Sequence, residues 1–408
     1  MVFEYLVILI FTLLTLEVLL FFLVKIVRKN FQWLITKNID DKVIFDQNLL
    51  KKFKKHSFHK KLGWEPKPNT SGKDIHDCKE IKYNIGKFGQ RVSYNEKNLK
   101  KNQCLIFGDS FAFSRQVSDN NTISSHLNKK SNLKFYNFGV GNYGLDQAIL
   151  RFEKIYFNLH PKYVIFIIVP ETICRIQSMW KHFFEYGNIL AFKPRFIVDK
   201  DSLKLLRCPL KSINNAEINN AIIYSKKNDI FYKKKFQKDL IFMPYIFSLF
   251  KNNLRGLKIV LSYLDFKIKG KSIKKWKDEA FFKIVLKNNA LLTKNFYKNQ
   301  NSLLLMYKLF ERINLFCKDK KVTPIIAMIP QIQDIHLIKG SQDYMESFEK
   351  KLKRFKGMKF LNFTKLFLKE SSKIDKIYLD KSGNHLSSFG NNFVAKKLFA
   401  EISKIKNV

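Results

Sequence analysis

Two groups of polar residues, far apart in the chain, are of types that carry out acyl chemistry together. An apolar run at residues 105–107 ends in Gly108-Asp109-Ser110, and near the other end of the chain Asp380 precedes His385 by five positions. A serine hydroxyl becomes a nucleophile when a histidine accepts its proton and a carboxylate orients that histidine. The two groups therefore predict Ser110 as a nucleophile, His385 as its base and Asp380 as the orienting carboxylate.

Each group alone also has a simpler interpretation. Gly-Asp-Ser is common in turns, and Ser110 suits the cap of a following helix. His385 is one of eight histidines, and its loop is also explained as a capped entry to the last helix. The Gly-x-Ser-x-Gly elbow of the α/β-hydrolases is absent, because Phe111-Ala112 follows Ser110, so that family is not supported.

The elements that must position these groups alternate between strands and helices. Their apolar runs and helical periodicity predict buried strands at 103–107, 133–138, 163–169, 322–329 and 358–363, and helices at 121–130, 145–157, 302–317, 342–355 and 389–405. This alternation predicts a doubly wound parallel sheet in a three-layer α/β/α fold. Ligands bind at the carboxyl ends of such strands, and Ser110 directly follows the first one.

Further polar groups follow the second and third strands, at the same edge of the sheet. Gly139-Val-Gly141-Asn142-Tyr-Gly144 lets the backbone approach a ligand closely, and the acidic residue of a dinucleotide site is missing downstream. Glu171 and Thr172 lie where an oxyanion donor or a substrate-positioning group is expected. Arg175 either binds a carboxylate of the substrate or pairs with Glu171 on the surface of a helix.

Taken together, these motifs resemble the SGNH/GDSL hydrolase superfamily over residues 103–169 and 302–405. The resemblance implies a flavodoxin-like α/β/α fold and an enzyme that hydrolyses or transfers acyl esters without a cofactor. It implies Ser110 as the nucleophile, with Asp380 and His385 as its partners. It also places a backbone N–H of the oxyanion hole at Gly141 or Asn142.

The sequence departs from the family pattern at two places. The third block, usually Gly-x-Asn-Asp, reads Val-Pro-Glu171-Thr172, so the side-chain amide of the oxyanion hole is missing and the Thr172 hydroxyl is the substitute. The family aspartate commonly stands three residues before the histidine, where this chain has Ser382, so Asp380 needs a longer loop. Loss of one oxyanion donor slows an esterase by about 10²–10³-fold. A catalytically inactive SGNH-like protein that binds a glycan or a partner is therefore the alternative.

The N-terminal segment is predicted to anchor the chain in a membrane. Residues 5–24 are almost all apolar and reach about 30 Å as a helix. No Ala-x-Ala cleavage site follows, so we expect a retained single-pass anchor. Lys25 and Arg28 on its carboxyl side favour a cytoplasmic body, although the lysine-rich composition inflates this signal and the side stays open. Glu17, within the apolar run, is either protonated or faces a partner helix.

Composition excludes several other classes of function. Of the 75 basic residues only ten are arginine, and the lysines that give the net charge of +41 are spread over the whole chain. Nucleic-acid readers favour arginine and clustered basic stripes, so no nucleic-acid partner is expected. The lysines are interpreted as solvated faces, or as attraction to anionic lipid or acidic glycan. Five dispersed cysteines without a Cys-x-x-Cys pair predict neither a metal site nor a disulfide framework.

The sequence thus predicts five regions along the 408 residues. These are a transmembrane anchor (1–29), a connector (30–100), two halves of an SGNH-like domain (101–191 and 301–408), and a mostly helical insertion without assigned chemistry (192–300). The predicted function is ester hydrolysis or O-acyl transfer on an acylated glycan or glycolipid of the cell envelope. The predicted partners are that substrate and membrane lipid.

Overall fold

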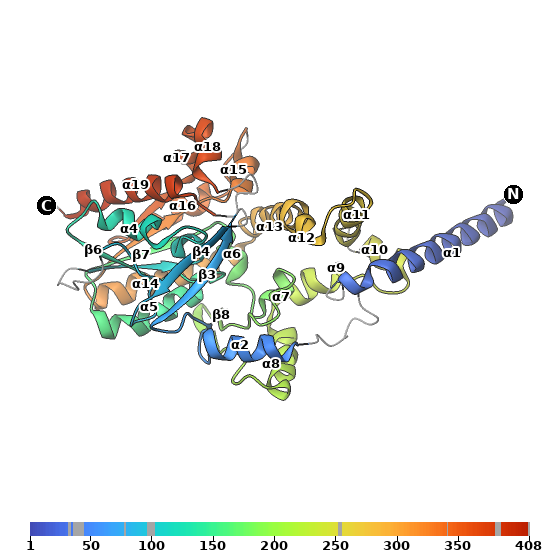
Figure 1. Cartoon of the computed structure of the whole chain (residues 1–408), viewed down its shortest axis with the longest axis horizontal. Helices are drawn as coiled ribbons and strands as arrows, with labels where there is room; N and C mark the ends of the chain where they lie inside the picture. Colours follow the sequence, from blue (N-terminus) through green and yellow to red (C-terminus); the bar gives the residue numbers. More distant parts are fainter. Residues whose placement is uncertain are drawn as a thin grey trace.

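A parallel β-sheet forms the centre of the body of the molecule (Figure 1). The computed structural model describes residues 1–31, 34–35, 45–76, 79–95, 103–251, 255–340, 342–379 and 385–406, and within them this sheet has five strands in the order β11-β10-β7-β5-β6. The strands are β5 (Gln103–Gly108), β6 (Lys134–Asn137), β7 (Tyr163–Ile168), β10 (Thr323–Met328) and β11 (Lys359–Asn362). The first strand in the chain thus lies between the second and the third, which is the flavodoxin-like order. The predicted fold class is confirmed.

The apolar character of the strands follows from their pairing and covering. The central strand β7 pairs in parallel with β5 on one side and with β10 on the other, and all six of its residues are buried. A strand that is paired on both edges and covered on both faces has no position for a polar side chain. This is why β7 reads as a continuous apolar run rather than an alternating one.

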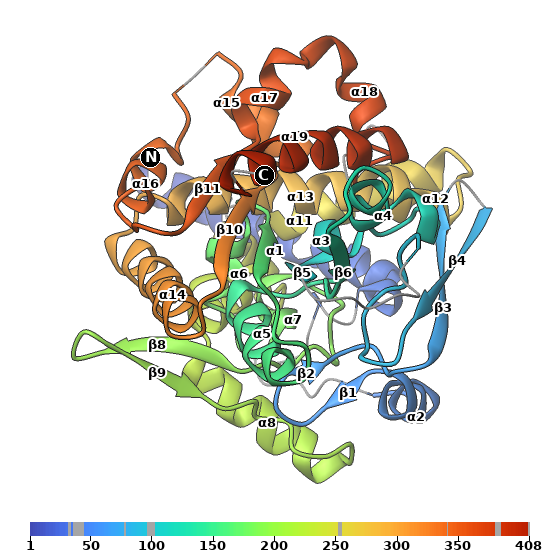
Figure 2. The same ribbon diagram turned by 90° about the vertical axis from the view of Figure 1, so that its left-hand side faces the viewer.

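Helices cover both faces of the sheet, as Figure 2 shows. Alternate strand residues point to opposite faces, so Phe107 packs with one set of helices and Ile106 with the other. The first face carries α5 (Leu145–Leu159), α14 (Gln300–Asp319) and α16 (Glu346–Leu352). The second carries α3 (Ser110–Phe113), α4 (Ile123–Asn128), α15 (Ile332–Ile338), α17 (Thr364–Lys369), α18 (Ile374–Ile377) and α19 (Ser388–Lys406).

Three antiparallel pairs of strands lie outside the central sheet within the described residues, and the shortest is β1 (Phe58–His59) with β2 (Gly63–Trp64). In the second, β4 (Lys79–Ile85) pairs with the preceding β3 (Thr70–His76), and the chain then returns beside the end of β4 through a bridge between Ile85 and Arg91. The region 192–300 is mostly helical, as predicted, but it begins with β8 (Arg195–Asp199) and β9 (Ser202–Leu206). Their two-residue turn, Lys200-Asp201, has positive φ at both positions without the glycine that usually marks such a turn.

The N-terminal helix α1 (Val2–Val27) extends away from the body (Figure 1). By length and composition it is able to cross a membrane, and it is apolar over its whole length apart from a few positions. Its carboxyl end is not isolated: Val24 and Val27 are buried in a cluster with Ile241, Tyr245 and other residues of the 192–300 region.

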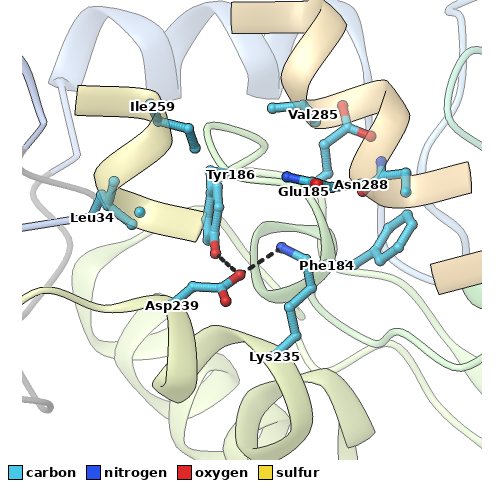
Figure 3. A pocket seen from close by; sticks show the side chains of 11 residues that line it. Leu34, Phe184, Glu185, Tyr186, Lys235, Asp239, Ile259, Val285 and Asn288 are labelled. Carbon is cyan, nitrogen blue, oxygen red and sulfur yellow. Dashed lines mark hydrogen bonds and ion pairs between the residues drawn. The ribbon is translucent and has the colours of Figure 1, made fainter. Parts of the chain in front are cut away.

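The 192–300 region is built mainly of helices. They are α8 (Asn215–Asn228), α9 (Gln237–Asp239), α10 (Tyr245–Lys251), α11 (Arg255–Ile268), α12 (Ile273–Trp276) and α13 (Phe282–Phe296). A small cavity of about 20 Å³, enough for about one water, lies among Leu34, α7 (Lys181–Phe184), α11 and α13. Figure 3 shows Tyr186 and Lys235 both pointing at the Asp239 carboxylate, which accepts a hydrogen bond from the first and pairs with the second at 3.2 Å.

Two glycines of the turn after β6 give a matched test of the packing around α3. A Cβ atom on Gly139 would lie 2.2 Å from the backbone nitrogen of Phe113, whereas one on Gly141 would meet nothing within 4 Å. We expect Gly139→Ala to destabilise the protein by about 1–3 kcal/mol or more, because the backbone of α3 must move. Gly141→Ala should leave the melting temperature near that of the wild type. Equal melting temperatures for the two variants would contradict this packing.

Candidate active site

Ser110 lies at the carboxyl end of β5, where the strand order reverses. Gly108 turns the chain there with φ of +145°, and a Cβ atom at this position would lie 1.9 Å from the carbonyl oxygen of Ile167 on β7. Ser110 is the first residue of α3, and the helix is capped by Asp109, whose carboxylate accepts the N–H of Phe111 at 2.8 Å. The cap therefore does not use the Ser110 hydroxyl, and Ser110 as a whole is 7% exposed at the sheet edge.

His385 reaches the same place from the other end of the chain. Its ring packs on Phe111, the residue after Ser110, with centroids 5.7 Å apart. Its Nδ1 is 2.6 Å from Oε1 of Gln116, 269 residues earlier in the sequence. Within the described residues no hydrogen bond joins the Ser110 hydroxyl to His385, so the two are neighbours through Phe111. Asp380, predicted to orient His385, lies outside the described residues.

Gln116 contacts His385 at Nδ1, the ring nitrogen that an orienting group binds when Nε2 acts as a base. Its Nε2 donates to the carbonyl of Ile75 at 3.2 Å, and this fixes the amide with Oε1 toward His385. An acceptor at that point requires the histidine to donate from Nδ1. A neutral His385 then carries its lone pair on Nε2, which is the tautomer that a general base needs.

The loop that carries Gln116 is held by groups from outside the sheet. Gln116 has φ of +63°, which is uncommon for a residue other than glycine and often marks a functional site. Asp74 on β3 accepts its backbone N–H at 3.2 Å and pairs with Arg115 at 3.0 Å. The fully buried Arg91 donates to the carbonyls of Phe113, Ser114 and Val117 and pairs with Asp119 at 3.0 Å.

A buried ionic cluster lies behind Ser110. The Arg175 guanidinium donates to Asp109 and to Glu171, each at 2.8 Å, and also to the carbonyl of Tyr143 at 3.4 Å. Burial lowers the pKa of Arg175, but Glu171 and Asp109 together outweigh burial and raise it above its usual value. Burial raises the pKa of Asp109, and Arg175 opposes that shift. The predicted pair of Glu171 and Arg175 is present, but both side chains are buried, so its interpretation as a surface pair is wrong.

This cluster reaches the helical insertion, to which the sequence assigned no chemistry. Asn289 on α13 donates to the second oxygen of Glu171 at 3.3 Å, and Thr293 on the same helix is 3.6 Å from the sulfur of Cys174. Glu171 is thus engaged by Arg175 and Asn289 within the protein. Thr172, the first residue of α6 (Thr172–Arg175), is buried at the same edge of the sheet.

The glycine turn after β6 lies beside the serine turn. The Val140 N–H donates to the Gly108 carbonyl at 3.0 Å, and the Tyr143 N–H returns to the Val140 carbonyl at 3.2 Å. Gly141 and the left-handed Asn142, with φ of +69°, therefore form the tip of a tight turn. The N–H groups at the tip of such a turn take no part in its own hydrogen bond, and these are the groups that the resemblance assigned to an oxyanion hole.

Comparisons with known proteins find similarity of structure alone. No family model matches the chain, and no curated protein matches its sequence. Among solved structures, a protein assigned to the G-D-S-L family of lipolytic proteins from Desulfitobacterium hafniense DCB-2 is similar with a TM-score of 0.34 and 10% identity, over 74% of this chain and 99% of that one. The psychrotrophic esterase EstA from Pseudoalteromonas sp., in a structure inhibited by monoethylphosphonate, has a TM-score of 0.32 and 10% identity, over 76% and 100%. These similarities are remote, and the fold assignment stands on the strand order itself.

The part of the chain that the structure describes holds no group of three or more histidine, cysteine, aspartate or glutamate residues suited to a metal ion. The polar groups around Ser110 instead pair with one another. Their arrangement suits acid–base and nucleophilic chemistry by side chains and backbone N–H groups.

Asp334, behind the site on α15, gives a pH-dependent test. Burial raises its pKa from 3.8 to about 7, against hydrogen bonds from Tyr344 and from the N–H of Gln331. Between about pH 4 and pH 7 the folded state therefore holds a proton that the unfolded state has released. The free energy of unfolding falls as the pH rises across this range, and the protonated carboxyl's contribution is lost once the pH has risen through 7. Relative to Asp334→Asn, the wild type should lose up to about 4 kcal/mol between pH 4 and pH 8. Chemical denaturation at several pH values measures this difference, and parallel pH profiles would refute the assignment.

Proposed function

We propose that this chain is a serine-dependent ester hydrolase or O-acyltransferase of SGNH/GDSL type. The observation that carries the proposal is that the His385 ring packs on Phe111, the residue after Ser110, at the switch point of the sheet, with its Nδ1 2.6 Å from Oε1 of Gln116. A parallel sheet of this order offers its ligand site at that point. Ser110 and Gln116 belong to one segment after β5 and His385 comes from the other end of the chain, so the position of His385 beside Phe111 and Gln116 is a property of the fold rather than of a local motif.

In the proposed reaction, the Ser110 oxygen attacks the carbonyl carbon of an acyl ester while His385 Nε2 accepts the hydroxyl proton. The carbon–oxygen bond to the alcohol then breaks, and the same proton passes to the leaving alkoxide. Water releases the acid in a hydrolase, and a sugar hydroxyl takes the acyl group in a transferase. In both cases His385 accepts a proton from the incoming nucleophile and returns it to Ser110.

Backbone N–H groups supply the charge stabilisation in this proposal. The N–H of Ser110, at the first turn of α3, and the N–H of Asn142, at the tip of the glycine turn, would donate to the oxyanion. Glu171 stands where the family has an amide donor, and its carboxylate accepts from Arg175 and Asn289. We therefore assign Glu171 and Arg175 to the support of Asp109, and the Thr172 hydroxyl to the third donor position.

The proposed substrate class is an acylated glycan or glycolipid of the cell envelope, approached from a membrane. The burial of Val24 and Val27 against the body supports a retained α1, because removing this helix would expose the apolar cluster that it completes. The proposal holds for a body on either side of that membrane.

A glycan- or partner-binding protein without turnover is the second candidate. The observation that favours it is the acidic Glu171 in place of an amide donor, since a carboxylate repels a developing oxyanion. The two candidates differ in whether Ser110 is activated.

Labelling of the full-length protein with a fluorophosphonate tests this activation directly. The wild type should become labelled, Ser110→Ala should lose all labelling, and His385→Ala should label about 10²–10⁴-fold more slowly, since the base is removed. Ser202→Ala, on the exposed β8–β9 turn, is the matched serine control and should label like the wild type. A folded wild type that takes no label would favour the binding protein.

Gln116 is tested by the pH dependence of the same labelling. Gln116→Ala should slow the reaction about tenfold or more, because the imidazole loses the acceptor that fixes its tautomer. Gln116→Glu should move the acidic limb of the rate profile to higher pH, because a carboxylate beside the imidazole stabilises its protonated form. A role limited to packing would leave both profiles superimposable on that of the wild type.

A further inference from the structure

One segment of the insertion has the composition of a membrane element although it is far from α1 in sequence. Residues 240–250 read Leu-Ile-Phe-Met-Pro-Tyr-Ile-Phe-Ser-Leu-Phe, eleven positions without a charged side chain in a chain of net charge +41. Ser248 carries the aliphatic hydroxyl of this segment, and that hydroxyl donates to the carbonyl of Tyr245 at 3.0 Å. The second half of the segment is helix α10, which lies beside the carboxyl half of α1 (Figure 1).

The side chains of this segment divide into two sets. Ile241, Tyr245 and Leu249 are buried in the cluster with Val24 and Val27 of α1. The other set points outward, and Met243 is 55% exposed, Phe247 61% and Phe250 73%. Adjacent exposed groups of this size are unusual on a surface that faces water. They continue the apolar surface of α1, on which Phe11 and Phe22 are also exposed.

Glu17 joins the two elements by hydrogen bonds. One carboxylate oxygen accepts the N–H of Tyr245 at 2.5 Å, and the other accepts the N–H of Ile246 at 2.9 Å. These are N–H groups of the first turn of α10, which have no partner within their own helix. The sequence left Glu17 as either protonated or facing a partner helix. Glu17 faces a partner helix, and that helix is α10.

The position of Glu17 along α1 sets the depth of this contact. Glu17 stands ten residues before the end of α1 at Val27, or about 15 Å along the axis at 1.5 Å per residue. Lys25 and Arg28 mark the polar end of the helix. With that end at the membrane surface, Glu17 and the first turn of α10 lie near the middle of a hydrocarbon layer about 30 Å thick. No water is present there to satisfy a backbone N–H, so a protein group must accept it.

We propose that residues 240–250 form a second membrane-inserted segment, which enters the leaflet beside α1 and returns to the same side, with Glu17 accepting its backbone N–H groups. Eleven residues are too few to cross a bilayer, so the segment is re-entrant. The occupant of the exposed face of Met243, Phe247 and Phe250 is the acyl-chain region of the lipid bilayer. The proposal rests on α1 as a retained membrane span and is independent of esterase activity.

Fluorescence quenching in phosphatidylcholine vesicles tests the insertion. The variants Phe247→Cys, Phe11→Cys and Phe157→Cys are each prepared in a full-length chain that also carries Cys78→Ser, and the new thiol is labelled with an environment-sensitive dye. The cysteines at 104, 174, 208 and 317 are buried. Phe157, on α5, is 61% exposed like Phe247 and serves as the matched control in water. Phe11, 73% exposed on α1, serves as the control in lipid.

We expect the label at 247 to behave like the label at 11. Both should lose fluorescence to a lipid with a nitroxide on its acyl chain and resist iodide in the water, and the label at 157 should do the opposite. A label at 11 in lipid with a label at 247 in water would overturn the proposal and leave the anchor intact. Labels at 11 and 247 both in water would overturn the anchor and the proposal together. Shielding of 247 from iodide without quenching by the nitroxide lipid would indicate a second copy of the chain on this face, and would also overturn it.

Glu17 is tested in the same vesicles. Glu17→Leu should reduce quenching of the label at 247 by the nitroxide lipid and leave the label at 11 unchanged, because α10 loses the acceptor that holds it in the leaflet. Glu4→Leu is the matched control, since Glu4 is an exposed carboxylate on the same helix that pairs only with the chain terminus at 3.1 Å. Equal quenching at 247 in both variants would remove Glu17 from the proposed role. Circular dichroism and the melting temperature of each variant show whether the protein is folded, so a failed proposal is distinguished from a misfolded protein whether or not Ser110 is activated.

Discussion

The guanidinium of Arg175 is the interaction on which the arrangement of the site depends. It binds Asp109 of the serine turn, Glu171 at the end of the third strand and the carbonyl of Tyr143 after the glycine turn. Removing one partner from a buried ion pair costs about 3–5 kcal/mol, because the other charge is left without compensation. The Arg175 cation therefore fixes the relative positions of three loops, each of which follows a different strand. Asp109, next to Ser110, accepts the Phe111 N–H with one carboxylate oxygen and binds Arg175 with the other.

The same cluster links the site to the N-terminal helix. Glu171 binds Asn289 on α13, and the helices that precede α13 pack against the carboxyl end of α1. The 192–300 region thus connects the sheet edge with α1. Its aromatic side chains, such as Trp276 and Tyr263, pack around Phe31 just beyond α1. These contacts restrict the orientation of the body relative to α1.

Much of the fold was predictable because burial leaves a direct mark on the sequence. The five parallel strands were found within one or two residues, since a strand that is covered on both faces must be a continuous apolar run. The hairpin β8–β9 was missed because its turn, Lys200-Asp201, lacks the usual glycine. Helix α15 was missed because its seven residues are too few to show a clear periodicity.

The sequence by itself determined the chemistry available to this protein: a serine after a buried strand, a histidine before the last helix, and a carboxylate within an apolar N-terminal run. Tertiary structure alone decided the partners. Gln116 meets His385 across 269 residues, Arg175 turns inward to Asp109, and Glu17 meets an N–H group 228 residues away. The physical reason is that residue type and local periodicity are properties of neighbours in the chain. A hydrogen bond between distant segments is fixed only when the packing of the whole fold brings donor and acceptor within about 3 Å.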